Sequence, residues 1–153
     1  MFEELSKIYT EVAQTTITVL PDKWKAFWIR QECRTSSWGF RSFYEVEGSD
    51  EIRQFRAPID ATRLIHDAWK ISRANNDRWS SIVFHVVAPG ELHISFGHDN
   101  YDDEECDGSY DRANEFDDKT FAGRTVVPMP FDMEGSFSLT PEMLKSGVLG
   151  PPS

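Results

Sequence analysis

Residues 2–20 carry apolar side chains at steps of three and four positions. The apolar positions are Phe2, Leu5, Tyr9, Val12, Ala13 and Leu20, and Glu3, Glu4, Lys7, Glu11 and Gln14 lie between them. This spacing predicts an amphipathic helix over residues 2–20 with one face docked on a core. Pro21 follows directly and fits the end of the helix, because proline cannot continue a helical backbone.

A second helix is expected to begin at residues 58–60, where Asp60 is the candidate N-cap. Its apolar face consists of Leu64, Ile65, Ala68, Trp69 and Ser72. His66 lies away from this face, so we expect its side chain in solvent. The polar residues 75–77 (Asn-Asn-Asp) end the helix.

Alternation of apolar and polar residues predicts strands elsewhere in the chain. Residues 38–46 alternate clearly, with Phe40 and Tyr44 on one side and Arg41 and Glu45 on the other. Residues 24–33 are rich in aromatic side chains but carry apolar residues at both parities, so the inner face of this segment is not assigned. Residues 51–57 are an expected third strand.

Residues 79–87 and 92–97 are typical of a second hairpin, turning at Pro89 and Gly90. A three-residue loop over 89–91 sets Val86 opposite Ile94 and Phe84 opposite Phe96. All large apolar residues of the two strands then share one face of the sheet. A two-residue loop would instead place the apolar residues of one strand on the opposite face. We therefore expect the three-residue loop.

Together these elements predict a single α+β domain over residues 1–123. The expected architecture is an antiparallel sheet of four to six strands with two main helices packed on one face. A chain of 153 residues is long enough to bury a core of this kind. Residues 124–153 form a proline-containing extension, expected to be partly irregular, with a helical turn over residues 140–144.

Negative charge is concentrated in one segment of the chain. The whole chain has 16 basic and 26 acidic residues, a net charge of −10. Residues 99–118 hold ten carboxylates and one basic residue, Arg112, so this segment carries −9 and the remainder −1. We therefore expect no nucleic-acid partner, because phosphate contacts need clustered positive charge.

The remaining composition favours a cytoplasmic protein. Cys33 and Cys106 are too few for a disulfide scaffold and fit a reducing compartment. The N-terminus is acidic where a signal peptide is basic, and no apolar run approaches the ~18 residues of a membrane span.

Short catalytic motifs are absent from the sequence, so we expect neither enzymatic activity nor a cofactor. One alternative is a metal-binding module. Residues 103–111 place oxygen ligands and Gly108 at the spacing of a calcium-binding loop, but Asn114 stands where a bidentate Glu is needed. His85 and His93 lie diagonally in the expected hairpin, and two imidazoles without a third ligand do not predict a metal site.

The acidic segment is instead interpreted as a recognition surface for a basic protein. Tyr101, Tyr110 and Phe116 are interleaved with the carboxylates, as suits an aromatic anchor surrounded by steering charges. The candidate binding residues are Asp99, Tyr101, Asp102, Asp103, Glu104, Glu105, Asp107, Tyr110 and Asp111. A solvated acidic face that only aids solubility is the competing interpretation.

Three motifs carry a family resemblance. They are Leu5-x-x-Ile8-Tyr9-x-x-Val12-Ala13 in the first helix, Leu20-Pro21-x-x-Trp24 before the first hairpin, and Trp79-Ser80-Ser81-Ile82-x-Phe84 with Gly90-x-Leu92-x-Ile94-x-Phe96-x-x-Asp99 in the second hairpin. In this order they resemble the YezG-like immunity protein (antitoxin) family over residues 2–118. His98 departs from the aromatic residue often found before the acidic position, and the chain after residue 123 has no counterpart.

The resemblance implies a protein that binds and neutralises a bacterial toxin domain, commonly a nuclease, without catalysis of its own. Toxin-binding residues vary among such proteins, so the candidate residues above come from the charge argument alone. The expected function is occlusion of a basic toxin by the acidic surface. The sequence leaves the oligomeric state open.

Overall fold

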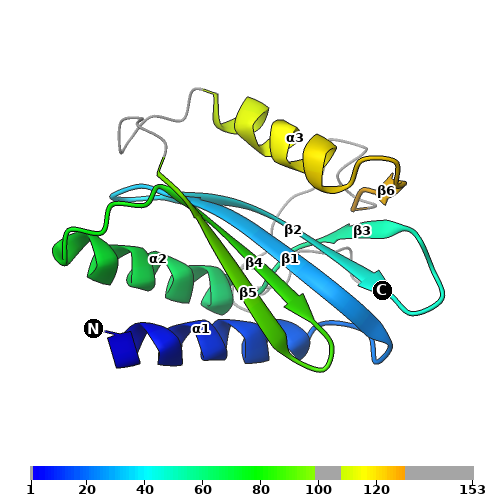
Figure 1. Ribbon diagram of the computed structural model, residues 1–153, viewed down its shortest axis with the longest axis horizontal. Helices are drawn as coiled ribbons and strands as arrows, with labels where there is room; N and C mark the ends of the chain where they lie inside the picture. Colours follow the sequence, from blue (N-terminus) through cyan, green and yellow to red (C-terminus); the bar gives the residue numbers. More distant parts are fainter. Residues whose placement is uncertain (1, 99–107, 130–153) are drawn as a thin grey trace, which may run out of the picture.

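The computed structural model describes residues 2–98 and 108–129 of the chain (Figure 1). The elements, in chain order, are α1 (Phe2–Ile17), β1 (Trp24–Cys33), β2 (Trp38–Val46), β3 (Ile52–Phe55), α2 (Ile59–Ala74), β4 (Ser81–Val87), β5 (Glu91–Gly97), α3 (Ser109–Thr120) and β6 (Val126–Val127).

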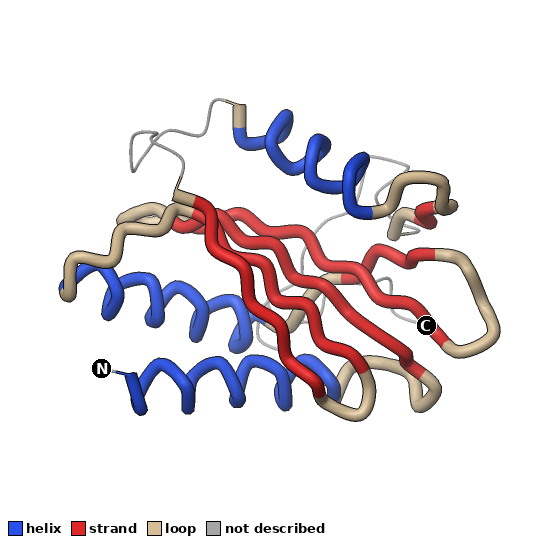
Figure 2. The backbone as a smooth tube through the Cα atoms, viewed as in Figure 1, coloured by secondary structure: helices blue, strands red, loops and turns tan. Residues whose placement is uncertain are grey.

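Six strands form one twisted sheet in the order β5-β4-β1-β2-β3-β6 (Figure 2). Neighbouring strands are antiparallel except for the short parallel pair of β3 and β6. Helices α1 and α2 lie side by side on one face of the sheet, and α3 lies on the other face (Figure 1). The predicted α+β class, the number of strands and the two main helices on one face are confirmed.

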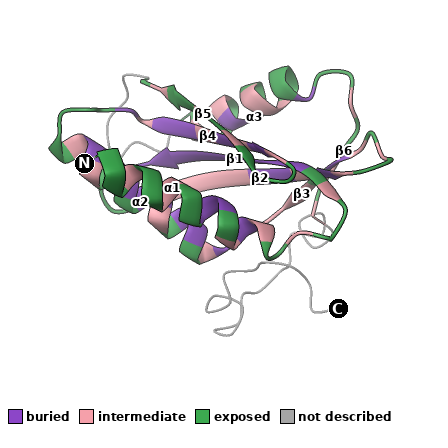
Figure 3. Cartoon of the chain, turned by 60° about the horizontal axis from the view of Figure 1, so that its bottom comes forward, coloured by how far each residue is buried: buried purple, intermediate pink, exposed green. Residues whose placement is uncertain are grey.

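Strand β1 is buried on both of its faces. Phe27 and Ile29 belong to the main core beneath α1 and α2, whereas Ala26 and Trp28 belong to a smaller core beneath α3. This explains why the sequence of β1 has apolar residues at both parities: each parity meets a helical layer. Figure 3 shows the resulting concentration of buried residues along the central strands.

The register of the β4–β5 hairpin differs from the predicted one by two residues. Val86 pairs with Leu92 and Phe84 pairs with Ile94, so the three-residue loop spans 88–90 instead of 89–91. A shift of two preserves the parity of each strand. The predicted apolar face is therefore confirmed, and only the partners on it change.

Two predictions for α2 were wrong: its N-cap and the exposure of His66. Asp60 was the expected N-cap, but Pro58 takes that position two residues earlier and the helix begins at Ile59. Asp60 lies in the first turn and forms an ion pair with Arg63. His66 was expected in solvent but is buried, with its Nε2 2.6 Å from the carbonyl oxygen of Arg34. The expected helix end is confirmed, since Asn75 is the C-cap.

The start of the predicted C-terminal extension contributes to the sheet. Val126 and Val127 form β6 and pair with Ile52 and Arg53 of β3. The helical turn expected over 140–144 lies outside the described residues. Each helix in the described ranges is too short or too polar to cross a lipid bilayer.

Candidate protein-binding surface around helix α3

The structure describes the second half of the acidic segment and places it in α3. Tyr110 and Asp111 lie in the first turn of this helix, and the Tyr110 side chain is 75% exposed. Asp111 is also exposed. The other candidate binding residues lie outside the described residues: Asp99, Tyr101, Asp102, Asp103, Glu104, Glu105 and Asp107.

A cluster of arginines around Glu32 fixes the first half of α3 to the sheet. The Glu32 carboxylate is only 3% exposed and accepts hydrogen bonds of 2.8 Å from Arg112 Nη2 of α3 and from Arg30 Nη1 of β1. Although burial raises the pKa of Glu32, these hydrogen bonds outweigh it and hold the pKa below its ordinary value. Glu32 is therefore a charged anchor for α3.

A second polar contact involves Arg41 of β2 and three residues of α3. Arg41 Nη1 donates to Asp117 Oδ2 at 2.6 Å and to Asn114 Oδ1 at 2.8 Å. Its guanidinium carbon lies 4.8 Å from the centre of the Tyr110 ring, a cation–π distance. Arg41 thus holds Tyr110 from beneath while most of the Tyr110 side chain stays exposed.

Apolar packing fixes the end of α3. Phe121 follows the helix and is 3% exposed. Its ring centre lies 5.0 Å from that of Trp28, 4.9 Å from that of Phe43 and 6.2 Å from that of Phe116. A buried aromatic in such a cluster contributes about 3–5 kcal/mol relative to alanine.

The carboxylates of α3 divide into two groups. Asp117 is paired with Arg41 and Glu115 with Lys119, so these two charges are balanced within the molecule. Burial raises the pKa of Asp117, and its hydrogen bond with Arg41 offsets this only in part. Asp111 and Asp118 are exposed and face solvent. The outward negative charge of the described helix therefore comes mainly from these two residues.

Only the second half of the alternative calcium-binding loop lies in the described ranges, and it is part of α3. Gly108 is the N-cap of α3 with a left-handed φ of 80°, and Asp111 and Asn114 lie in the helix. Residues 103–107 of that loop lie outside the described residues. No group of three or more His, Cys, Asp or Glu side chains is placed to hold a metal ion in the part of the chain that the structure describes.

His85 and His93 are directly opposite in the hairpin instead of diagonal, with ring centres 5.8 Å apart. His85 stacks on Trp28 at 4.7 Å, and burial lowers its pKa, with the neighbouring His93 adding to this effect. A stacked, neutral imidazole fits a structural role in the sheet surface.

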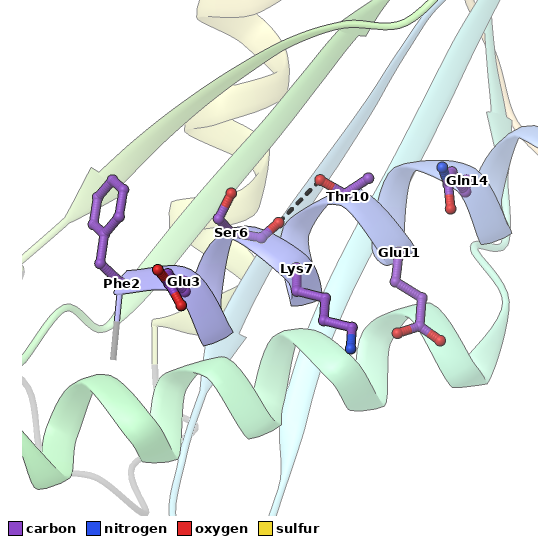
Figure 4. A pocket seen from close by; sticks show the side chains of 7 residues that line it. All are labelled: Phe2, Glu3, Ser6, Lys7, Thr10, Glu11 and Gln14. Carbon is purple, nitrogen blue, oxygen red and sulfur yellow. Dashed lines mark hydrogen bonds between the residues drawn. The ribbon is translucent and has the colours of Figure 1, made fainter.

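A hollow of about 720 Å³ lies along α1. All of its lining residues belong to that one helix, and Figure 4 shows their side chains spread along it instead of converging. The hydrogen bond drawn there joins Thr10 Oγ1 to the carbonyl oxygen of Ser6 at 2.9 Å. Catalysis needs reactive groups directed at one point, and this arrangement does not provide it.

Sequence analysis did not identify Arg41, Arg112 and Phe121 as parts of this surface. Two signals for α3 were present. Arg112 is the only basic residue in the acidic segment, and Ala113 and Phe116 are three positions apart, as on one face of a helix. No sequence signal links Arg41 to a helix 73 residues later.

Comparison with known proteins adds no family assignment. No protein-family model matches the chain, and no curated protein matches it.

Proposed function

We propose that this chain is an immunity protein that binds a cognate bacterial toxin domain and neutralises it by occlusion. The partner is a basic domain, of the nuclease class, and the chain acts in the cytoplasm without catalysis or a cofactor. The observation that carries this proposal is that residues 99–118 hold −9 of the chain's net charge of −10. The charge suggests a basic partner, and the family resemblance over residues 2–118 suggests that this partner is a bacterial toxin of the nuclease class.

The architecture of α3 supports a binding role over mere solubility. A solvating face needs no fixed geometry, but α3 is fixed by the buried Glu32–Arg112 contact and by Phe121. This attachment keeps Tyr110 exposed next to Asp111 at the start of the helix. A rigid aromatic side chain beside acidic residues is the composition expected of an interface anchor.

Two physical effects set the association and dissociation rates of the proposed complex. Exposed carboxylates steer a basic partner and raise the association rate, and salt weakens this effect. Desolvation of Tyr110 at the interface slows dissociation, since most affinity differences between related complexes arise in dissociation rates. Blocking the toxin then requires only that the complex cover its cationic cleft.

The first test measures binding to a cognate toxin domain, to be sought as a basic C-terminal domain of a secreted protein encoded beside this gene. We expect Asp111→Lys combined with Asp118→Lys to slow association about tenfold at low salt, because steering depends on these exposed charges. Tyr110→Ala is expected to speed dissociation with little change in association. Surface plasmon resonance separates the two rates.

The matched control places the same charge change on the opposite face. Asp60→Lys combined with Asp67→Lys alters two exposed carboxylates of α2 and should leave the association rate nearly unchanged beyond the general effect of net charge. If the α2 variant weakened binding while the α3 variant bound normally, the acidic-surface proposal would be wrong.

A further inference from the structure

The two edges of the sheet differ in how they are protected from pairing with another strand. At one edge, β6 is two residues long and Pro128 follows it, a short edge next to a residue that cannot donate a backbone hydrogen bond. At the other edge, β5 has seven residues, all in regular register with β4. Its sequence contains neither lysine nor proline. No strand pairs with the outer side of β5 in the described ranges.

An apolar groove runs beside this open edge, between β5 and the first half of α1. Its volume is about 400 Å³, and Phe2, Leu5, Leu92, Ile94 and Phe96 contribute apolar lining. Phe2 is 82% exposed and Phe96 is 43% exposed. Apolar surface of this kind beside an unpaired strand marks a site of association.

The sequence of β5 is complementary to itself about Ile94. In an antiparallel pair of two β5 strands centred on this residue, Ile94 faces its own copy and Leu92 faces Phe96. These three residues share the face that borders the groove, so the pairing brings apolar side chains together on that face. On the other face, His93 meets Ser95.

Charge also permits this pairing in a chain of net charge −10. Glu91 is the only acidic residue of β5, and in the centred register it lies opposite Gly97, so like charges are not paired. The acidic segment starts after His98, and the two copies of His98 would lie about 27 Å apart at 3.4 Å per residue. That separation exceeds the Debye length of about 8 Å at physiological salt.

We propose that two copies of this chain associate through β5, antiparallel about Ile94, so that one sheet continues through both copies. The contact is isologous, which closes the assembly at a dimer. It uses the sheet edge and the α1 groove and leaves α3 uncovered. The dimer contact and helix α3 use different described residues, so substitutions in β5 and in α3 test the dimer and the proposed toxin binding separately.

Light scattering coupled to size-exclusion chromatography tests the dimer with the full chain across a dilution series. The wild type is expected at twice the chain mass of 17.6 kDa, with the monomer appearing on dilution. Phe96→Lys introduces a charge opposite Leu92 and is expected to give a monomer. Val126→Lys is the matched control, since Val126 is 38% exposed on the opposite edge, and it should remain a dimer.

A cysteine variant tests the register and does not depend on how well Phe96→Lys folds. In a Cys106→Ser background, Ile94→Cys is expected to form a disulfide-linked dimer on oxidation, because opposite residues of paired strands lie within disulfide reach. Val126→Cys should form none. A wild type that stays monomeric throughout, or a dimer that does not cross-link at residue 94, would overturn the proposal.

Discussion

Glu32 is the buried acidic side chain that attaches the first half of α3 to the sheet. It is buried, and three guanidinium groups surround it: Arg30 and Arg112 at 2.8 Å and Arg34 at 3.7 Å. A buried charge is costly unless it is paired, and removing one partner leaves the others uncompensated. Glu32 therefore couples the sheet, the loop after β1 and α3 through one carboxylate.

Glu32→Gln is expected to lower the free energy of unfolding by about 3–5 kcal/mol, because the arginines lose their shared counter-charge in a buried site. Urea denaturation measures this. Glu51→Gln is the matched control: Glu51 also pairs with an arginine two residues away, Arg53, but at an exposed site, so its loss should cost less than about 1 kcal/mol. Equal losses in the two variants would contradict the assigned role of Glu32.

The contribution of Glu32 also depends on pH. Its pKa in the folded chain lies below the ordinary value of 4.5, so the unfolded chain binds a proton first as the pH falls. The stabilisation is therefore complete above the unfolded pKa and is lost as the pH drops through the folded pKa. The stability difference between wild type and Glu32→Gln should be constant near neutrality and shrink in acid, as urea denaturation at several pH values will show.

Cys33 is expected to be chemically inert in the native chain. The thiol is buried, and burial raises its pKa to about 12, so the reactive thiolate is nearly absent at neutral pH. In a Cys106→Ser variant, a thiol reagent such as Ellman's reagent should give no colour until guanidinium is added. Rapid labelling of the native variant would show that the core around β1 opens readily.

The third helix is the element that links the fold to the proposed function. It is attached to the sheet by Glu32 and Arg41 at polar contacts and by Phe121 at an apolar one. The main core beneath α1 and α2 is formed by different residues. Loss of α3 contacts should therefore loosen this helix more than the rest of the molecule.

Phe121→Ala is expected to cost about 3–5 kcal/mol of unfolding free energy, because the ring fills the space among Trp28, Phe43 and Phe116. Amide hydrogen exchange should speed up mainly in α3, with α2 changing least. Val19→Ala, at a site 37% exposed and outside both surfaces, is the control and should change stability by less than about 0.5 kcal/mol. Uniform acceleration across all helices would show that α3 does not behave as a separate unit.

Periodicity was sufficient to predict α1, α2 and the strands β2, β4 and β5, because each buries one face at a regular spacing. Strand β1 buries both faces, so alternation did not assign its inner face. It did not give the partners in the β4–β5 hairpin, since parity fixes the face of Phe84 and Ile94 but a shift of two residues preserves parity. The two-residue β6 pairs with a strand more than 70 residues earlier, and two residues are too few to show an alternating pattern.

Side-chain partners distant in sequence account for the other differences. His66 is buried because it lies between Trp38 and Trp69 and contacts the carbonyl of Arg34. Trp38 and Arg34 are about 30 residues away in sequence and come close to His66 only in the folded chain. The helical spacing of Ala113 and Phe116 in α3 was obscured because they lie in a segment, residues 99–118, with ten carboxylates. The acidic character of the segment was evident from sequence. Which carboxylates are paired and which are exposed was not, because the Arg41–Asp117 pair joins residues 76 positions apart.

In the molecule as a whole, two surfaces lie apart from each other. Helix α3 covers β1 and β2 on one face of the sheet, through Glu32, Arg41 and Phe43. The open edge at β5 lies at the end of the sheet, beside α1 on the opposite face. A dimer through β5 therefore leaves the described part of α3 (Ser109–Thr120) accessible to partners in both copies.

Hydrogen–deuterium exchange of the chain, alone and bound to a toxin domain identified as its partner, tests the central claim most directly. We predict that binding slows exchange in α3 (Ser109–Thr120), while the exposed side of α2 (Ile59–Ala74) keeps the exchange rates of the free chain. Slowed exchange on α2 with α3 unchanged would show that the toxin binds elsewhere and that the acidic surface is not the recognition site.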